Sequence, residues 1–292
     1  MDLRKFITIA SVDLCVAAGL WSLAEADAKA AMPKAEAAAA RLKAANSGIL
    51  YEAVTEDLNV GTVERIIAGA TVVVDGLDNF HTRALLNQAC VKHAVPWVYG
   101  ACLATYGNAA TFLPGTTACL HCILPGVGEA ATPPVSCETV GVLGPAAALV
   151  AAWQAAEALK IALGRKADVA RELMHFDLWD NEFSGLPMAR LPACPVCGLH
   201  QYDLLERGDR MATAALCGRD TVQVMPPASF RLDFDLLRET LGRIGPVEEN
   251  AFLMKFRADG HDVVVFRDGR AMVFGLADPT AALSLYGKYI GG

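Results

Sequence analysis

The sequence predicts an α/β protein in which a doubly wound, mainly parallel sheet is followed by a smaller α+β domain. Short apolar runs alternate with helical patterns through the first hundred residues, which is typical of parallel sheets with crossover helices. Antiparallel strand patterns and two Cys-x-x-C pairs follow. Beyond Cys197 the pattern changes to several short strands and two helices, which indicates a second domain.

The elements of the first hundred residues follow from their apolar patterns. Residues 5–12 suit either a strand or the first part of a helix. Residues 33–45 are rich in alanine and carry a proline in the first turn, which favours a helix. The other expected elements are a strand at 48–54, a helix at 61–69, a strand at 70–75, a helix at 82–94 and a strand at 96–100.

Antiparallel strands and one long helix complete the first domain. Residues 104–114 are expected to pair with the preceding strand, and residues 172–188 form two antiparallel strands. Residues 144–164 are apolar nearly all round, so this helix is expected to be buried in the core or at a subunit interface. The last segments predict the order β-α-β-β-β-α. The expected division is a first domain over 1–200, a linker over 201–216 and a C-terminal domain over 217–292.

The composition limits the classes of partner. Of the 292 residues, 54% are hydrophobic and 20% are charged, and the net charge is −7. This acidity argues against nucleic acid as the main partner but allows ATP. Residues 1–28 resemble a signal peptide, but Asp13 interrupts their apolar run, which is also too short to predict a membrane span. Nine cysteines, four of them in Cys-x-x-C pairs, favour a reducing compartment, so we expect a cytoplasmic protein.

Four cysteines have the spacing of a structural metal site. Cys119 and Cys122 belong to "CLHC", and Cys194 and Cys197 belong to "CPVCG". Two intervening residues let both sulfurs of a pair reach one metal ion, and four thiolates suit Zn²⁺ in a closed tetrahedral site. Such a zinc ion would be structural, because no coordination position stays open for a substrate. The alternatives are a redox pair, unliganded core cysteines, or His121 in place of one thiol.

Polar side chains follow the strand expected at 70–75. The segment "AGATVVVDGLDNFHTR" carries Asp75, Asp78 and Asn79 in the turn and Arg83 in the next helix. Open α/β sheets bind ligands at the carboxyl ends of their strands, and carboxylate oxygens are suitable ligands for Mg²⁺. The turn is therefore a candidate site for a magnesium-bound nucleotide, although Asp78 and Asn79 also suit a turn and a helix N-cap.

Six motifs carry a family resemblance. They are "VVVDGLDNFHTRALLNQAC", "VYGA", "CLHCILP", "SCETVGVLGP", "QAAEALK" and "CPVCG". Their order and spacing resemble the ThiF/MoeB/HesA family, the bacterial relatives of ubiquitin-activating enzymes, over residues 20–198. The resemblance implies a Rossmann-like fold and a dimeric adenylyltransferase. Such an enzyme uses Mg-ATP to adenylate the C-terminal glycine of a ubiquitin-like sulfur carrier for thiamine, molybdopterin or a related cofactor.

The resemblance also implies roles for individual residues. Asp78 matches a catalytic aspartate that handles magnesium and ATP, and Asn79 is its neighbour in the nucleotide pocket. Lys34 matches a lysine that contacts the phosphates, and Arg83 matches the ATP-site arginine that follows the aspartate motif. Cys137 matches a cysteine that, in some members, links covalently to the carrier or handles sulfur. A solvated Lys34 and a packed, unreactive Cys137 are the alternatives.

The N-terminal part departs from the family pattern. The family begins with a strand, a G-x-G-G-x-G turn and a helix whose N-terminus binds phosphate, but this sequence contains no G-x-G-x-x-G. Asp13 is a weak candidate for the ribose-binding acid, and Trp21 stands where the family has a phosphate-binding arginine. A truncated or frame-shifted gene and a paralogue without nucleotide binding are the two explanations. Residues 5–12 are candidates to take the place of the first strand.

Two functions are consistent with these motifs. The first is a sulfur-carrier adenylyltransferase, impaired because the glycine-rich loop and the phosphate-binding arginines are missing. The second is a non-catalytic, zinc-stabilised module that binds a ubiquitin-like carrier or a partner subunit. A dehydrogenase is disfavoured because it would need the absent glycine fingerprint. The last two residues, Gly291 and Gly292, resemble a carrier tail, although a frayed end after a helix is the simpler interpretation.

Overall fold

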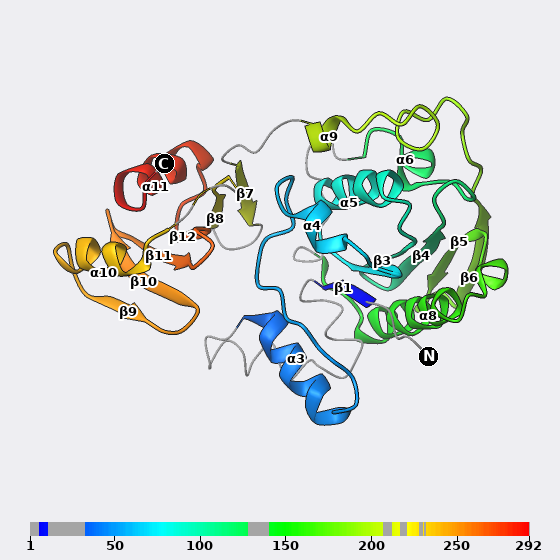
Figure 1. The fold of residues 1–292 in the computed structure, drawn as a ribbon, viewed down its shortest axis with the longest axis horizontal. Coiled ribbons are helices and arrows are strands. Elements are labelled where there is room, and N and C mark those ends of the chain that lie inside the picture. The colour runs from blue at the N-terminus through cyan, green and yellow to red at the C-terminus, as the bar shows by residue number, and fades with distance from the viewer. Residues whose placement is uncertain are drawn as a thin grey trace. The chain divides into compact units, whose positions relative to one another are not determined.

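The structure is a computed structural model that describes residues 6–10, 33–127, 140–206, 212–216, 221–227, 230 and 232–291. It divides into two compact units. Pro33, Thr55–Asp57 and the described residues from Ala212 onward belong to the smaller unit, and the other described residues belong to the larger one. Strands β1 to β6 form the sheet of the larger unit and strands β7 to β12 form that of the smaller unit; all of them except β2 are labelled in Figure 1.

The larger unit contains one six-stranded sheet in the order β1-β2-β3-β4-β5-β6. β2 pairs in parallel with β1 and β3, whereas β4 to β6 continue the sheet in antiparallel pairs. The antiparallel extension is as predicted, but it is wide enough to make the sheet mixed rather than mainly parallel. The strands are β1 (Phe6–Ala10), β2 (Val72–Gly76), β3 (Trp97–Leu103), β4 (Tyr106–Phe112), β5 (Glu172–Asp177) and β6 (Glu182–Pro187).

Helices cover both faces of this sheet (Figure 1). On one face, Leu86 of helix α5 packs with Val73, and on the other face Ile161 of helix α8 packs with Val72 and Val98. Neighbouring strand residues point to opposite faces, so β2 is buried on both sides, as parallel strands usually are. The helices of this unit are α3 (Lys34–Ala45), α4 (Val63–Ile67), α5 (Phe80–Lys92), α6 (Leu120–Ile123), α8 (Gly144–Ala162), the short 3₁₀ helix η2 (Lys166–Asp168) and α9 (Asp203–Glu206).

Helix α8 is buried on one side only in the single chain. Ala147, Val150 and Ile161 face the sheet, whereas Leu159 and Leu163 are 58% and 61% exposed. The predicted burial is therefore correct for the sheet-facing side, and the outer side carries exposed leucines. Neither α8 nor any other helix in the described ranges combines the length and the apolar character needed to cross a membrane.

Two sequence-based expectations in the N-terminal third have different outcomes. The strand predicted at 48–54 is wrong, because these residues pair with no strand in the described chain and Leu50 is 93% exposed. A strand needs a hydrogen-bonded neighbour for its backbone groups, and β2 already has β1 and β3 on its two sides. Residues 5–12, for which strand and helix were both open, contain strand β1, which lies beside β2 as the replacement first strand would.

The smaller unit is an antiparallel sheet in the order β7-β8-β12-β11-β10-β9, packed on two helices. The predicted order β-α-β-β-β-α is found, with β7 and β9 added. β7 lies inside the expected linker, and its "ATAAL" contains a single β-branched residue, so the sequence carried little strand signal. Its elements are β7 (Ala212–Leu216), β8 (Thr221–Met225), α10 (Phe234–Gly242), β9 (Val247–Glu249), β10 (Leu253–Ala258), β11 (His261–Phe266), β12 (Ala271–Phe274) and α11 (Pro279–Tyr289).

Candidate functional site

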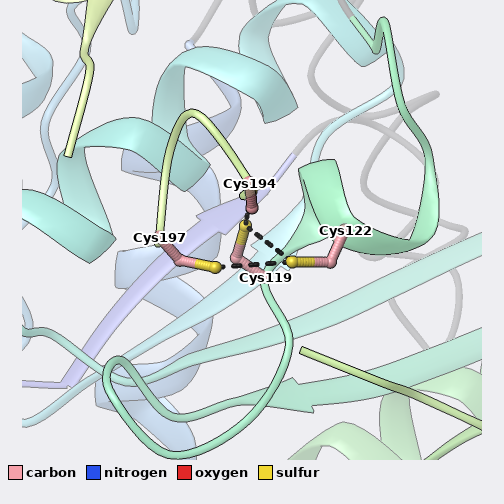
Figure 2. Close-up of side chains that lie close together, drawn as sticks. All are labelled: Cys119, Cys122, Cys194 and Cys197. Atoms are coloured by element: carbon pink, nitrogen blue, oxygen red, sulfur yellow. Dashed lines mark hydrogen bonds between the residues drawn. The ribbon is translucent and has the colours of Figure 1, made fainter. Parts of the chain in front are cut away.

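The four cysteines of the two Cys-x-x-C pairs form one cluster. Cys119 and Cys122 lie at α6, after β4, whereas Cys194 and Cys197 lie in the loop after β6. Figure 2 shows the four side chains converging on one another. The Sγ atoms are 3.9 Å apart for Cys119–Cys122, 3.8 Å for Cys119–Cys194 and 3.4 Å for Cys122–Cys197. The predicted meeting of the two pairs is therefore confirmed.

These separations fit a tetrahedral metal ion. Metal–sulfur bonds of about 2.3 Å in a regular tetrahedron place the sulfur atoms about 3.8 Å apart. All four Sγ atoms lie within 4.8 Å of one another, the residues are buried, and no disulfide joins them. His121 is outside this group of four. The cluster could thus hold one metal ion with four sulfur ligands.

The protein environment does not ionise all four thiols by itself. Burial raises the pKa of Cys119 far above its ordinary value and raises the pKa of Cys197 to about 11. Burial also acts to raise the pKa of Cys122, but backbone hydrogen bonds at Leu191 and Cys119 outweigh it, so that pKa is lowered. Thiolates packed this closely repel one another, and a bound divalent cation is what would stabilise all four together.

Side chains from α5 hold the segment that carries Cys119 and Cys122, and they also hold helix α9, which follows the second cysteine pair. Asn87 Oδ1 accepts a 2.9 Å hydrogen bond from the backbone N–H of Leu120, and Gln88 Oε1 accepts one of 3.0 Å from Leu204. Both amides are buried, and sequence analysis missed them. Gly198 is required by the second turn, since a Cβ there would lie 2.2 Å from the carbonyl oxygen of Pro192.

The second group of candidate residues lies at the end of β2 and in the connection to α5, which we call the strand-end loop (residues 75–79). Asp75 is fully buried and accepts the Leu77 N–H at 2.7 Å, whereas Asp78 is exposed. Asn79 is the N-cap of α5, because its Oδ1 accepts the Thr82 N–H at 2.8 Å. Its Nδ2 also donates to Asp78 Oδ1 at 3.0 Å. The N-cap interpretation of Asn79 is confirmed, and Asp78 lies on the surface beside the N-terminus of α5.

Arg83 is buried at the same end of the sheet. Its Nε donates to Asp75 Oδ2 at 2.9 Å, and its Nη2 donates to the carbonyl oxygens of Leu77 and, at 2.8 Å, Gly100. Burial acts to lower the pKa of Arg83, but the Asp75 carboxylate more than compensates, so the pKa is raised and the guanidinium stays charged. Its centre lies 5.2 Å from the centroid of the Tyr99 ring, a cation–π distance. These donors therefore serve protein acceptors at the end of β2, in the loop that follows it and on β3.

Two buried polar residues of α8 were also missed by the sequence analysis. The Nε2 of Gln154 donates to the carbonyl oxygens of Asp75 at 2.8 Å and Val98 at 3.0 Å. Glu157 accepts from the Thr111 hydroxyl at 2.9 Å. Both residues are at most 2% exposed. The available signal was two polar residues, three positions apart, inside the otherwise apolar "AAWQAAEAL".

The structure does not describe the side chains of the other predicted site residues. Lys34 begins α3, and its side chain lies outside the described part of the structure. Cys137, Asp13 and Trp21 also lie outside the described residues. A cavity of about 300 Å³ is lined by residues that include Pro96, before β3, and it does not include the strand-end loop.

The fold and the two groups of residues define an α/β protein with a polar strand end and a metal-type cysteine cluster. Residues 23–196 match the model of the ThiF family, and the chain belongs to this family. The resemblance that the sequence motifs carry is therefore confirmed.

Curated relatives agree with this membership. The chain is 39% identical over 272 residues to the sulfur carrier protein ThiS adenylyltransferase of Bacillus subtilis, covering 91% of this chain and 79% of that protein. It is 37% identical over 184 residues to the SAMP-activating enzyme E1 of Haloferax volcanii, covering 63% of this chain and 67% of that protein. Among solved structures, E. coli MccB with ATP covers 56% of this chain and 51% of that chain, at 19% identity and a TM-score of 0.47.

Proposed function

We propose that this chain adenylates the C-terminal carboxylate of a ubiquitin-like sulfur carrier with Mg-ATP and releases pyrophosphate. The main support is the 39% identity to a ThiS adenylyltransferase over 91% of the chain. A second relative, the SAMP-activating enzyme E1, carries an activating function in its name. Thiamine biosynthesis is the pathway that the ThiS relatives suggest for the carrier.

The strand-end loop is the proposed nucleotide site. In this proposal Asp78 provides a carboxylate oxygen to the magnesium ion of the substrate, for which one or two protein carboxylates usually suffice. Asn79 orders the first turn of α5, whose N–H groups face the same end of the sheet. Lys34 would neutralise phosphate charge, and Cys137 would handle the activated carrier or its sulfur. The exposure of Asp78 leaves its carboxylate accessible to such a ligand.

The cysteine cluster is the proposed structural zinc site. Cys119, Cys122, Cys194 and Cys197 would supply four thiolates, and the zinc ion, when bound, would supply charge and a rigid crosslink rather than a reaction site. The Sγ separations of 3.4 to 3.9 Å support this role. A homodimer is a further part of the proposal, supported by the exposed Leu159 and Leu163 on the outer side of α8.

ATP–pyrophosphate exchange in the presence of a ThiS-type carrier tests the proposed function. We expect carrier-dependent exchange that falls about a hundredfold in Asp78→Asn, because that variant removes charge stabilisation from the metal-triphosphate. Asp180→Asn, an exposed carboxylate in the β5–β6 turn, is the matched control and should retain exchange.

The absence of a G-x-G-x-x-G segment favours one competing function, the non-catalytic binding module. That function predicts a tight complex with the carrier and no exchange by the wild-type chain. Exchange that is the same in wild type and Asp78→Asn would contradict the role proposed for the loop.

A further inference from the structure

The backbone ladder between β2 and β3 stops before the strand-end loop begins. The two strands pair at Val73↔Trp97 and Val74↔Val98, and no later pair joins these two described strands. Buried carbonyl groups at and beyond this last pair still need hydrogen-bond donors. Side chains from helices on opposite faces of the sheet supply them.

Gln154 of α8 forms the first bridge across the separating strands. Its Nε2 donates one hydrogen bond to the carbonyl of Asp75, on β2, and one to the carbonyl of Val98, on β3. The residue is fully buried. A single amide group thus joins the two strands immediately where their own pairing ends.

Arg83 of α5 forms the second bridge. Its Nη2 joins the carbonyl of Leu77, in the loop, to that of Gly100, on β3, while its Nε holds the Asp75 carboxylate. The two bridges together extend the connection from the last ladder pair to the residue that precedes Asp78.

The orientation of the Gln154 amide is determined by its surroundings. Turning the amide over would place Oε1 against two carbonyl oxygens, which only an N–H donor can satisfy. In the described structure Oε1 itself has no hydrogen-bond partner, so the two donor contacts account for the hydrogen bonding of this amide. A Cβ on Gly100 would lie 2.5 Å from both Cδ and Nε2 of Gln154, so the bare glycine makes room for the bridge.

We propose that Gln154 is a positioning residue that fixes the separation of the β2 and β3 ends and thereby presents Asp78 to the magnesium ion of a bound nucleotide. The inference rests on the proposed function for its chemical consequence. Gln154 itself touches no substrate in this proposal. Gln154 acts by holding the Asp75 carbonyl, and Arg83 holds the next part of the loop through the Leu77 carbonyl.

Two variants disturb the bridge in different ways, one by removing the donor and one by filling the space that the donor occupies. Gln154→Met keeps a side chain of similar length but removes both donors, and Gly100→Ala crowds the intact amide while keeping the Gly100 carbonyl. Glu157→Gln is the control, because Glu157 lies on the same helix, is 2% exposed and binds Thr111 rather than the loop.

Hydrogen–deuterium exchange of the ligand-free protein tests the bridge itself. We expect amide exchange in residues 76–82 to rise about tenfold in Gln154→Met and Gly100→Ala, because buried carbonyls lose their donor. Glu157→Gln should leave exchange in this segment unchanged relative to the rest of the sheet. Equal exchange in residues 76–82 across wild type and both bridge variants would overturn the proposal.

The magnesium dependence of ATP–pyrophosphate exchange tests the chemical consequence. The Mg²⁺ concentration that gives half-maximal exchange should rise about ten- to a hundredfold in the two bridge variants and stay unchanged in Glu157→Gln. An unchanged Mg²⁺ requirement in both bridge variants would overturn the positioning role. If the wild type shows no ATP–pyrophosphate exchange, the proposed function fails. The hydrogen–deuterium exchange experiment alone then decides whether Gln154 positions the loop.

Discussion

At the scale of residues, the strand-end loop combines structural contacts with an accessible carboxylate. Asn79 caps α5 and also donates to Asp78. A carboxylate beside a helix N-terminus is favoured by the positive end of the helix dipole. The cap interpretation and the nucleotide-site interpretation are therefore compatible, because Asn79 orders the turn while Asp78 stays exposed.

Removing the cap should destabilise the larger unit. Asn79→Ala loses the acceptor for the Thr82 N–H, so we expect the free energy of unfolding to fall by about 1 kcal/mol. Urea denaturation followed by far-UV circular dichroism measures the change. Asn79→Asp is the matched variant, because aspartate caps helices as well as asparagine does. A loss in Asn79→Asp as large as that in Asn79→Ala would show that the cap is not the source of the stability.

At the scale of elements, regular apolar patterns made most strands and helices predictable. Val72 to Val74 form the short continuous apolar run that a strand buried on both faces requires, and both this strand and the helix around Leu86 were predicted. The strand at 48–54 was wrong because a local pattern contains no information about whether a neighbouring strand is available. The four cysteines were predictable from spacing, whereas Gln154 and Asn87 were not, since their roles depend on which distant carbonyl or N–H lies opposite them.

Helix α11 is tied to the β10–β11 turn by a charged contact that should respond to acid. Asp259 accepts from Lys288 Nζ at 2.9 Å and from the Tyr289 hydroxyl at 2.8 Å, and these bonds lower the pKa of Asp259. A lowered carboxyl pKa means that the contact stabilises the fold above about pH 4 and that this stabilisation is lost as pH falls through the folded-state value.

A double-mutant cycle of Asp259→Asn and Lys288→Met measures that contact. Asp259 has a φ of 49°, and asparagine tolerates this left-handed backbone, so the substitution removes charge without adding strain. We expect the coupling between the two sites, from thermal denaturation midpoints, to be constant from pH 7 to about pH 5 and to shrink below about pH 4. A coupling that does not change with pH would contradict an ionic contact.

At the scale of the whole molecule, the alignment with the Bacillus relative extends over both units. That alignment covers 91% of the chain, which is more than the larger unit contains, whereas the family model ends at residue 196. The cysteine cluster lies entirely within the larger unit, where it joins segments 75 residues apart. Metal binding should consequently affect the stability of one unit and leave the other unchanged.

Metal removal tests this separation. Purified protein should contain one zinc ion per chain, and chelation should lower the melting temperature of the larger unit while the transition of the smaller unit stays in place in calorimetry. The stabilisation should be below the about 10–16 kcal/mol of zinc-finger peptides, because a packed core already holds the sheet around Val73 and Trp97.

Two cysteine variants make the metal test specific. Cys194→Ser replaces one thiolate of the cluster and should reduce the zinc content, because a hydroxyl is a poor zinc ligand. The three remaining cluster thiols should then react with a thiol reagent. Cys90→Ala removes a buried free thiol of the same unit that is not part of the cluster, so it should retain one zinc ion per chain. The outcome that would contradict a metal site is a wild-type protein that is purified without metal and whose melting temperature does not change when zinc is added. The four sulfur atoms would then pack together without a metal ion.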